Sequence, residues 1–368
     1  EMGGLPWWLL KKKDIRLRER DPYFMERVKI FETEVGKQLA PLTIQNGGPI
    51  IMVQVENEYG SYGVDKEYVR EIRDCLRSVG FDKVALFQCD WASNFLNNGL
   101  DDLVWTMNFG TGANIDDQFR KLKEVRPNSP LMCSEFWSGW FDKWGARHET
   151  RSAKDMVAGL DEMLSKGISF SLYMTHGGTS FGHWAGANSP GFAPDVTSYD
   201  YDAPINEYGQ ATPKYYELRN MMQKYSDKKL PAVPKPVAPI ITVPKFELNE
   251  FAPLVYGCGG SETGEDVNDL TFEYADMGWG TMFYTVALPE IPVSSTLTFE
   301  GHDYAQVFVN STFVGKTDRV KNEKTVTLPA VKKGDKLTIL VEAMGRINFG
   351  RAIKDFKGIV GDVKIETT

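Results

Sequence analysis

The sequence predicts an α/β unit built on a parallel sheet, followed by a smaller all-β unit. Short apolar segments alternate with amphipathic helices from Asp21 to Tyr225, and strands that are separated by helices must pair in parallel. Long loops rich in glycine and aromatic residues follow these strands. Their position favours a (β/α)8 barrel, with a functional site at the carboxyl ends of the strands, over a doubly wound sheet.

Two of the predicted helices begin at recognisable caps. Asp21 and Pro22 form an N-cap and a first helical residue, and an apolar face then extends to Pro41. The residues of this face are Phe24, Val28, Phe31, Val35 and Leu39. Further helices are predicted over residues 65–79, 114–126 and 152–166, and Thr212 with Pro213 marks another start.

Five short apolar runs predict the strands of the parallel sheet, over residues 49–55, 84–88, 103–107, 131–134 and 169–174. The first run follows Gly47 and Gly48 and is nearly continuous in apolar residues. Continuous apolar runs are typical of strands that are covered on both faces, so we expect this strand to be buried.

Prolines separate the two predicted units. Five of them lie between Lys228 and Lys245, which predicts a stiff, extended linker. We therefore divide the chain into a barrel portion (1–228), a linker (229–245) and a β-sandwich domain of jelly-roll type (246–368). Apolar or alternating runs between turn residues predict strands of the last domain over residues 281–288, 295–299, 306–309, 325–328 and 336–341.

Composition excludes several classes of protein. The 42 basic and 50 acidic residues give a net charge of −8, which argues against a nucleic-acid-binding role. No apolar stretch approaches the ~20 residues that a membrane span needs. The four cysteines contain no CxxC pair and predict neither a disulfide framework nor a zinc site. Neither nucleic acid nor a membrane is therefore an expected partner.

Two glutamates lie where predicted strands end. Glu58 follows the first strand and Glu135 the fourth, each among aromatic residues. An acidic side chain at the end of an apolar strand is expensive to desolvate, so this placement favours a functional site over a packing role. Hydrolysis of a glycosidic bond needs such a pair: one carboxyl group protonates the leaving oxygen, and the other attacks the anomeric carbon or activates water. Nearby tryptophan and tyrosine rings offer flat faces for a sugar.

Four motifs follow one another along the chain: Glu56-Asn57-Glu58-Tyr59-Gly60, Ser134-Glu135-Phe136-Trp137-Ser138-Gly139-Trp140, Gly177-Gly178-Thr179-Ser180-Phe181 and Thr197-Ser198-Tyr199-Asp200-Tyr201-Asp202-Ala203-Pro204. Together they resemble the β-galactosidases of glycoside hydrolase family 35. Residues 344–350 and 355–358 are similar to the family's first β-domain. The resemblance implies a (β/α)8 barrel followed by an all-β domain. It also implies exo-acting hydrolysis of terminal non-reducing β-D-galactosyl residues of galactosides and glycans, without a cofactor or metal.

The resemblance further implies roles for single residues. Glu58 is the expected general acid/base, and Glu135 is the expected nucleophile of a retaining double displacement. Strand alternation places Glu56 on the same face as Glu58, where it is expected to buttress the site. Asn57 is expected to hydrogen-bond the sugar next to the scissile bond.

Three aromatic residues complete the implied site. Tyr173 and Tyr201 are expected to orient the nucleophile and the galactose, and Trp140 is expected to line the pocket. The electrostatics of the glutamate pair agrees with these roles. An ionised Glu135 raises the pKa of a nearby Glu58, and formation of a glycosyl-enzyme removes that effect, so that Glu58 then acts as a base. Retention predicts carboxyl groups roughly 5 to 5.5 Å apart.

The strand numbering leaves two interpretations open. In the family the acid/base follows strand four and the nucleophile follows strand seven, so strands four to eight are expected here and strands one to three upstream of Glu1. The chain is then either the central part of an exo-β-galactosidase or a carbohydrate-binding or inert structural piece. Another retaining β-glycosidase, such as one acting on β-glucosaminides, is the alternative among enzymes. The resemblance implies export to the periplasm, the extracellular space or the lysosome, and the oligomeric state is not predicted.

Overall fold

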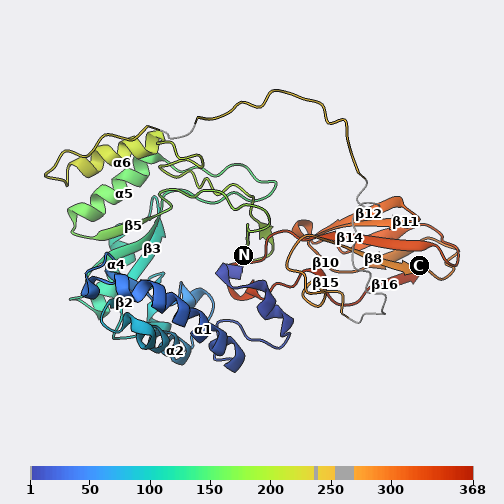
Figure 1. Cartoon of the computed structure of the whole chain (residues 1–368), viewed down its shortest axis with the longest axis horizontal. Helices are drawn as coiled ribbons and strands as arrows, with labels where there is room; N and C mark the ends of the chain where they lie inside the picture. Colours follow the sequence, from blue (N-terminus) through green and yellow to red (C-terminus); the bar gives the residue numbers. More distant parts are fainter. Residues whose placement is uncertain (1, 236–238, 253–268, 368) are drawn as a thin grey trace.

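The computed structural model describes residues 2–235, 239–252 and 269–367. Its first part is a curved parallel sheet flanked by helices, and its second part consists of antiparallel strands (Figure 1). The parallel sheet has the order β1-β2-β3-β4-β5. Its strands are β1 (Met52–Gln54), β2 (Ala85–Asp90), β3 (Val104–Gly110), β4 (Met132–Trp137) and β5 (Ser169–Tyr173). The predicted parallel pairing is confirmed, since each strand lies beside the next one along the chain.

The α-helices of the described part are α1 (Pro22–Leu39), α2 (Lys66–Leu76), α3 (Phe95–Asn98), α4 (Ile115–Val125), α5 (Ala153–Ser165) and α6 (Pro213–Gln223). All but α3 begin within one residue of a predicted helix start. In five of them the N-cap side chain accepts a hydrogen bond from the first helical turn; the caps are Asp21, Asp65, Asn114, Ser152 and Thr212. The exception is the short α3, which the sequence did not predict.

The predicted burial of the first strand is wrong. Among the described residues β1 pairs with β2 alone, so its other edge is open, and Ile51 just before it is 63% exposed. The predicted apolar face of α1 is likewise only partly covered: Phe24 is buried, whereas Phe31 is 69% exposed. Both deviations have one physical reason. This helix and this strand lie at the edge of the sheet, where no described element packs against their outer side.

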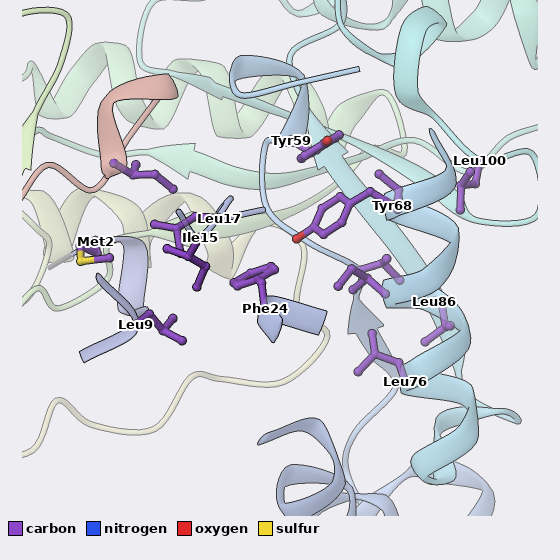
Figure 2. Close-up of a cluster of buried hydrophobic side chains, with 14 of the residues drawn as sticks. Met2, Leu9, Ile15, Leu17, Phe24, Tyr59, Tyr68, Leu76, Leu86 and Leu100 are labelled. Atoms are coloured by element: carbon purple, nitrogen blue, oxygen red, sulfur yellow. The ribbon is translucent and has the colours of Figure 1, made fainter. Parts of the chain in front are cut away.

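Buried side chains form two clusters in the first part of the chain. Figure 2 shows the first cluster, in which α1 contributes Phe24, α2 contributes Tyr68 and Leu76, and the N-terminal segment contributes Met2 and Leu9. The second cluster lies between the strands β3 and β4 and the helices α4 and α5, and includes Phe119, Phe136 and Leu160. The sheet is thus anchored to helices along its whole width, which gives the strand ends a rigid base.

The second part contains two main antiparallel sheets. One has the order β12-β11-β14-β8 and the other β13-β9-β16, and a shared core that includes Leu297, Val307, Leu328 and Ile339 packs between them. The strands are β8 (Thr281–Ala287), β9 (Ser295–Thr298), β11 (Tyr304–Val309), β12 (Thr312–Asp318), β13 (Thr325–Leu328), β14 (Lys336–Glu342) and β16 (Lys364–Thr367), with a small pair β10 (Gly301–His302) and β15 (Gly358–Ile359). The predicted sandwich is confirmed, and its jelly-roll order stays a prediction.

The two parts meet through a pair of loops. Ala187, in the small hairpin β6 (Ala187–Asn188) and β7 (Ala193–Pro194), exchanges backbone hydrogen bonds with Arg346 (2.9 Å) and Asn348 (3.0 Å). The neighbouring Gly186 leaves no room for a side chain, because a Cβ there would lie 1.9 Å from Asn348 Oδ1. The N-terminal segment also lies between the two parts (Figure 1), and Lys11 forms an ion pair of 2.8 Å with Asp276.

A buried ionic cluster supports this interface from the side of the β-sandwich. Lys357 Nζ lies 2.6 Å from Asp303 and 3.1 Å from Asp355, and Arg319 lies 2.7 Å and 2.9 Å from the same two carboxylates. The ring of Phe192, from the loop that follows β5, packs against both cations, 4.1 Å from the Arg319 guanidinium and 4.9 Å from the Lys357 ammonium. An aromatic side chain of the first part therefore packs directly on charged side chains of the second part.

The described residues include no helix that is both long and apolar enough to cross a membrane. Export of the chain stays a prediction, as does the division at residues 228 and 245.

Candidate active site

Glu58 lies beyond the end of β1, in a segment that contacts the last residues of β2. Its backbone N–H donates to the Cys89 carbonyl over 3.3 Å, and its backbone is left-handed with φ of 45°. This turn carries the side chain into the interior, where it is 7% exposed. There Asn108 Nδ2, from β3, donates a hydrogen bond of 2.9 Å to Glu58 Oε1.

Glu135 lies inside β4 and not after it, because β4 continues to Trp137. The register of β4 is irregular on both sides of Glu135, toward β3 and toward β5. Such irregularities bend a strand and redirect its side chains. Trp137 Nε1 donates a hydrogen bond of 3.1 Å to Glu135 Oε2, and Glu135 is the register partner of Asn108 across β3 and β4.

Asn108 is therefore a neighbour of both glutamates. It hydrogen-bonds Glu58 through its side chain and pairs with Glu135 through the strand register. The two carboxyl groups also interact electrostatically. Burial raises the pKa of Glu58 to about 7; the Asn108 hydrogen bond opposes this rise, and the charge of Glu135 adds to it. Burial also raises the pKa of Glu135, against the hydrogen bond from Trp137.

Glu56 does not share the face of Glu58, and the alternation argument for it is wrong. The strand β1 ends at Gln54, and the left-handed backbone of Glu56, with φ of 59°, turns its side chain away. Its carboxylate receives two hydrogen bonds from Arg18, of 3.0 and 2.6 Å, and one of 2.7 Å from the Tyr68 hydroxyl. Arg18 also donates to the Asn57 carbonyl over 2.7 Å. The ion pair therefore anchors the segment that carries Glu58, in agreement with a buttressing role.

Asn57 is exposed at the end of the sheet. Its Oδ1 accepts hydrogen bonds from Gln54 Nε2 (2.8 Å) and from the Cys89 thiol (3.2 Å). These two contacts hold the carbonyl end of the amide toward the protein. The Nδ2 end, which carries two donor hydrogens, lies on the opposite side of the amide.

The predicted aromatic residues lie together in one cluster. The rings of Tyr173 and Tyr201 meet edge to face with centroids 5.5 Å apart, and the Trp140 ring lies 6.3 Å from Tyr201 and 5.5 Å from Trp137. The Tyr173 hydroxyl hydrogen-bonds the Tyr199 hydroxyl at 3.1 Å. The charge of Glu135 contributes to raising the pKa of both Tyr173 and Tyr201, after the larger effect of burial. The aromatic cluster therefore lies close enough to Glu135 to interact with its charge.

A buried lysine and two close backbone contacts hold the aromatic loops in place. Lys214, at the start of α6 and 5% exposed, donates to the Ser138 carbonyl (2.9 Å) and to the Asp202 carboxylate (2.7 Å). A Cβ on Gly139 would lie 1.6 Å from the Tyr201 carbonyl, and one on Gly177 would lie 1.7 Å from the Tyr199 carbonyl. Gly139 thus lets the loop after β4 approach the loop after β5 closely, and Gly177 lets two segments of the loop after β5 approach each other.

Sequence reasoning missed several residues of this site, among them Asn108, Arg18 and Lys214. One signal was available for Asn108, since this amide lies between the apolar residues Met107 and Phe109. A polar side chain in such a run needs a buried partner. The other two make contacts over long sequence separations, for which the sequence contains no local signal.

Two protein families match this chain. The model described as glycosyl hydrolases family 35 matches residues 1–225, and that of the beta-galactosidase first all-beta domain matches residues 269–368. The chain belongs to glycosyl hydrolases family 35. The resemblance inferred from the motifs is thereby confirmed, as is the predicted barrel class: the curved five-stranded sheet is part of the family 35 barrel, and an all-β domain follows it.

Curated proteins named beta-galactosidase or beta-galactosidase-like resemble the chain along its length. It is 41% identical over 384 residues to a beta-galactosidase of Pongo abelii and 40% identical over 380 residues to that of Homo sapiens; each alignment covers 100% of this chain and 55% of the relative. A beta-galactosidase-1-like protein of Mus musculus is 38% identical over 378 residues, covering 98% of this chain and 57% of the relative. The chain thus spans little more than half the length of these family 35 proteins.

Proposed function

We propose that this chain carries the catalytic centre of a retaining exo-β-galactosidase, with Glu58 as general acid/base and Glu135 as nucleophile. One observation carries the proposal: Asn108 hydrogen-bonds Glu58 at 2.9 Å and is the register partner of Glu135. Two partly or fully buried carboxyl groups, one hydrogen-bonded by Asn108 and the other on the register partner of Asn108, meet the requirement of glycosidic hydrolysis for a carboxyl pair. Membership of family 35, and beta-galactosidases among the relatives, support galactose as the sugar.

In the first step, Glu135 attacks the anomeric carbon of the terminal galactosyl residue. The bond from that carbon to the leaving oxygen breaks, the Glu58 proton passes to this oxygen, and an ester bond forms with the Glu135 carboxylate. The pKa of Glu58, raised by burial to about 7, keeps the group protonated below neutral pH. Glu58 therefore starts the reaction as an acid.

In the second step, Glu58 acts as a base. Formation of the ester removes the negative charge of Glu135, and with it that charge's contribution to the raised pKa of Glu58. Glu58 then takes a proton from water, the resulting oxygen attacks the anomeric carbon, and Glu135 leaves as a carboxylate. Two inversions at one carbon give net retention.

The remaining predicted residues surround the sugar in this proposal. Asn57 presents its free amide nitrogen to a hydroxyl group, and Tyr173 and Tyr201 orient Glu135 and the galactose. Trp140 supplies a flat apolar wall to which the C–H face of the ring binds. The proximity of these rings to each other and to Glu135 supports this grouping.

A panel of aryl β-glycosides that differ only in the sugar tests the proposed substrate. We expect turnover of the β-galactoside by the full-length protein and much slower turnover of the β-glucoside, the β-glucosaminide and the α-galactoside. The Glu135→Gln variant is the blank for contaminating hydrolases. Preferred turnover of the glucosaminide would replace galactose in the proposal. Saturable binding of galactose without turnover would support the carbohydrate-binding alternative instead.

The stereochemistry of the product tests retention separately. Proton NMR during early turnover distinguishes the two anomers before they equilibrate in water. We expect β-galactose to appear first. Initial release of the α-anomer contradicts the double displacement, because it requires a single inversion.

A further inference from the structure

A chain of buried hydrogen bonds leads from the core of the sheet to Glu58. The Thr106 and Ser134 hydroxyl oxygens lie 2.7 Å apart, Ser134 Oγ donates to Asn108 Oδ1 over 2.7 Å, and Asn108 Nδ2 donates to Glu58 Oε1 over 2.9 Å. Thr106 is fully buried and Asn108 is 2% exposed. The chain thus connects residues of β3 and β4 to a carboxyl group that extends from the end of β1.

The direction of this chain follows from counting hydrogens. Each hydroxyl group has one. If Ser134 donates to Asn108 Oδ1, then Thr106 must donate to Ser134, and every bond lies between 2.7 and 2.9 Å, within the ordinary range. In the reverse direction Thr106 must donate to the Gln88 carbonyl, which lies 3.2 Å away and is long for a hydroxyl donor. The geometry favours the direction in which all donors point toward Glu58.

We propose that Asn108 is a positioning residue for Glu58, held as a hydrogen-bond donor by Ser134 and Thr106, so that Glu58 carries and delivers its catalytic proton from Oε2. A proton on Oε1 would face the Nδ2–H group of Asn108, so that two donors would oppose each other. Rotating the amide by half a turn would avoid this, but it would break the hydrogen bond that Ser134 donates to Asn108 Oδ1. Oε1 therefore remains an acceptor in both protonation states, and Oε2 is the oxygen that exchanges the proton.

This arrangement also explains how one carboxyl group serves in both steps. Burial disfavours the ionised form of Glu58, whereas the Asn108 hydrogen bond favours it. Without that bond, Glu58 would be a weaker acid in the first step and would be less readily available as a base in the second. The inference rests on the proposed role of Glu58 and adds to it a residue that does not contact the reacting atoms.

The test compares substitutions of similar size in β3 and directly after it, in the full-length protein. Asn108→Leu removes the donor, and Thr106→Val removes the far end of the chain without touching either glutamate. The control is Thr111→Val, because the Thr111 hydroxyl donates to the Trp137 carbonyl at 3.0 Å and takes no part in the chain. Thermal unfolding of each variant establishes whether it is folded. If Asn108→Leu does not fold, the test relies on Thr106→Val alone.

Kinetics with a poor leaving group gives the first measurement. We expect Asn108→Leu to lower kcat/KM about 10- to 100-fold, the range for loss of a hydrogen bond to a charged group. The alkaline limb of its pH profile should move to higher pH. Thr106→Val should act in the same direction with a smaller effect, and Thr111→Val should match the parent. If the alkaline limb of Asn108→Leu stays in place, the proposal is overturned. A shift of this limb to lower pH also overturns it, because it means that Asn108 accepts the proton of Glu58.

A double substitution separates this proposal from the assignment of Glu58. In a Glu58→Ala background, Asn108→Leu should cause little further loss, because the group that it positions is absent. A loss as large as in the parent means a structural role for Asn108 and overturns the proposal. If Glu58→Ala alone leaves the dependence on the leaving group unchanged, the role of Glu58 is itself wrong, and the proposal for Asn108 falls with it.

Discussion

Arg18 and Glu56 form a two-bond ion pair beneath the candidate acid/base, with Nε–Oε1 and Nη2–Oε2 distances of 3.0 and 2.6 Å. The side chains are 16% and 9% exposed. The pair joins the N-terminal segment to the residues just before Glu58. Removing either member of a buried ion pair leaves the other charge buried without compensation, which destabilises the folded state.

Loss of Arg18 should therefore destabilise the protein. For Arg18→Met we expect a loss of about 3 to 5 kcal/mol in the free energy of unfolding, the range for breaking a buried pair, together with a fall in kcat/KM. Urea unfolding followed by fluorescence measures the first effect. Arg16→Met is the matched control, since Arg16 is 59% exposed. The double variant Arg18→Met with Glu56→Gln should recover part of the stability, and an undiminished loss would contradict the ion-pair explanation.

Replacement of the candidate nucleophile should abolish turnover while leaving the fold intact. Glu135→Gln retains the shape of the side chain but cannot form the glycosyl ester. We expect kcat for an aryl β-galactoside to fall by several orders of magnitude, with little change in the midpoint of thermal unfolding. Mass spectrometry after incubation with a slow 2-fluoro galactoside should find the label on Glu135 in the parent protein. A label on another carboxylate would reassign the nucleophile.

The candidate acid/base should show its role through the leaving group. In Glu58→Ala, aryl galactosides whose phenols are strongly acidic need no proton and should lose much less activity in the first step than alkyl galactosides do. The measurement is kcat/KM across a series of phenols of increasing pKa. A steep dependence in the variant and a shallow one in the parent is the expected pattern. Equal losses for all substrates would speak against general acid catalysis by Glu58.

The pH dependence follows from the raised pKa of Glu58, about 7 in the folded chain. The protonated form is the active acid, so kcat/KM should fall as pH rises through about 7. The free energy of unfolding should also fall as pH rises, because the folded state binds this proton more tightly than the unfolded chain does. The fall occurs between the ordinary pKa of 4.5 and the raised pKa of about 7. Glu58→Gln should therefore raise the melting temperature at pH 8 by a few degrees and change it little at pH 4. An equal gain at both pH values would exclude this linkage.

Lys214 should matter for both stability and substrate binding, because its ammonium joins the loop at Ser138 to Asp202 beside Tyr201. For Lys214→Met we expect a loss of about 3 kcal/mol of stability, as for other broken buried pairs, and a higher KM from the displaced tyrosine. Lys224→Met is the control, since Lys224 is 63% exposed and pairs with Asp161 on the surface. Similar effects of the two substitutions would argue against a specific role for the buried lysine.

Local signals in the sequence were sufficient for most of the framework. Asp21 and Thr212 marked helix starts because an N-cap and a following proline act within one turn. The five parallel strands followed from apolar runs between helices. By contrast, β12 was missed, because the run Thr312–Asp318 contains a glycine and charged residues and acquires its strand partner, β11, only in the folded sheet.

The candidate site shows the same division between local and long-range information. Glu58 and Glu135 could be found from the sequence because carboxylates at the ends of apolar strands are unusual. The orientation of Glu56 could not, since its left-handed backbone breaks the alternation of the strand. The donor role of Asn108 depends on Ser134, which is 26 residues away. Such contacts arise when three strands come together, and no spacing rule along one strand describes them.

The loop contact at Ala187 has a consequence for the integrity of the chain. Its backbone nitrogen meets the Asn348 side chain across 161 positions of sequence, and the Phe192 ring packs on Arg319 and Lys357. We therefore expect cohesion of the two parts not to depend on the predicted proline-rich linker between them, which would then act as a tether that raises the effective concentration of one part near the other. A protease that cuts this tether should produce a nicked protein that elutes as a single species, and two fragments made separately should reassemble by complementation.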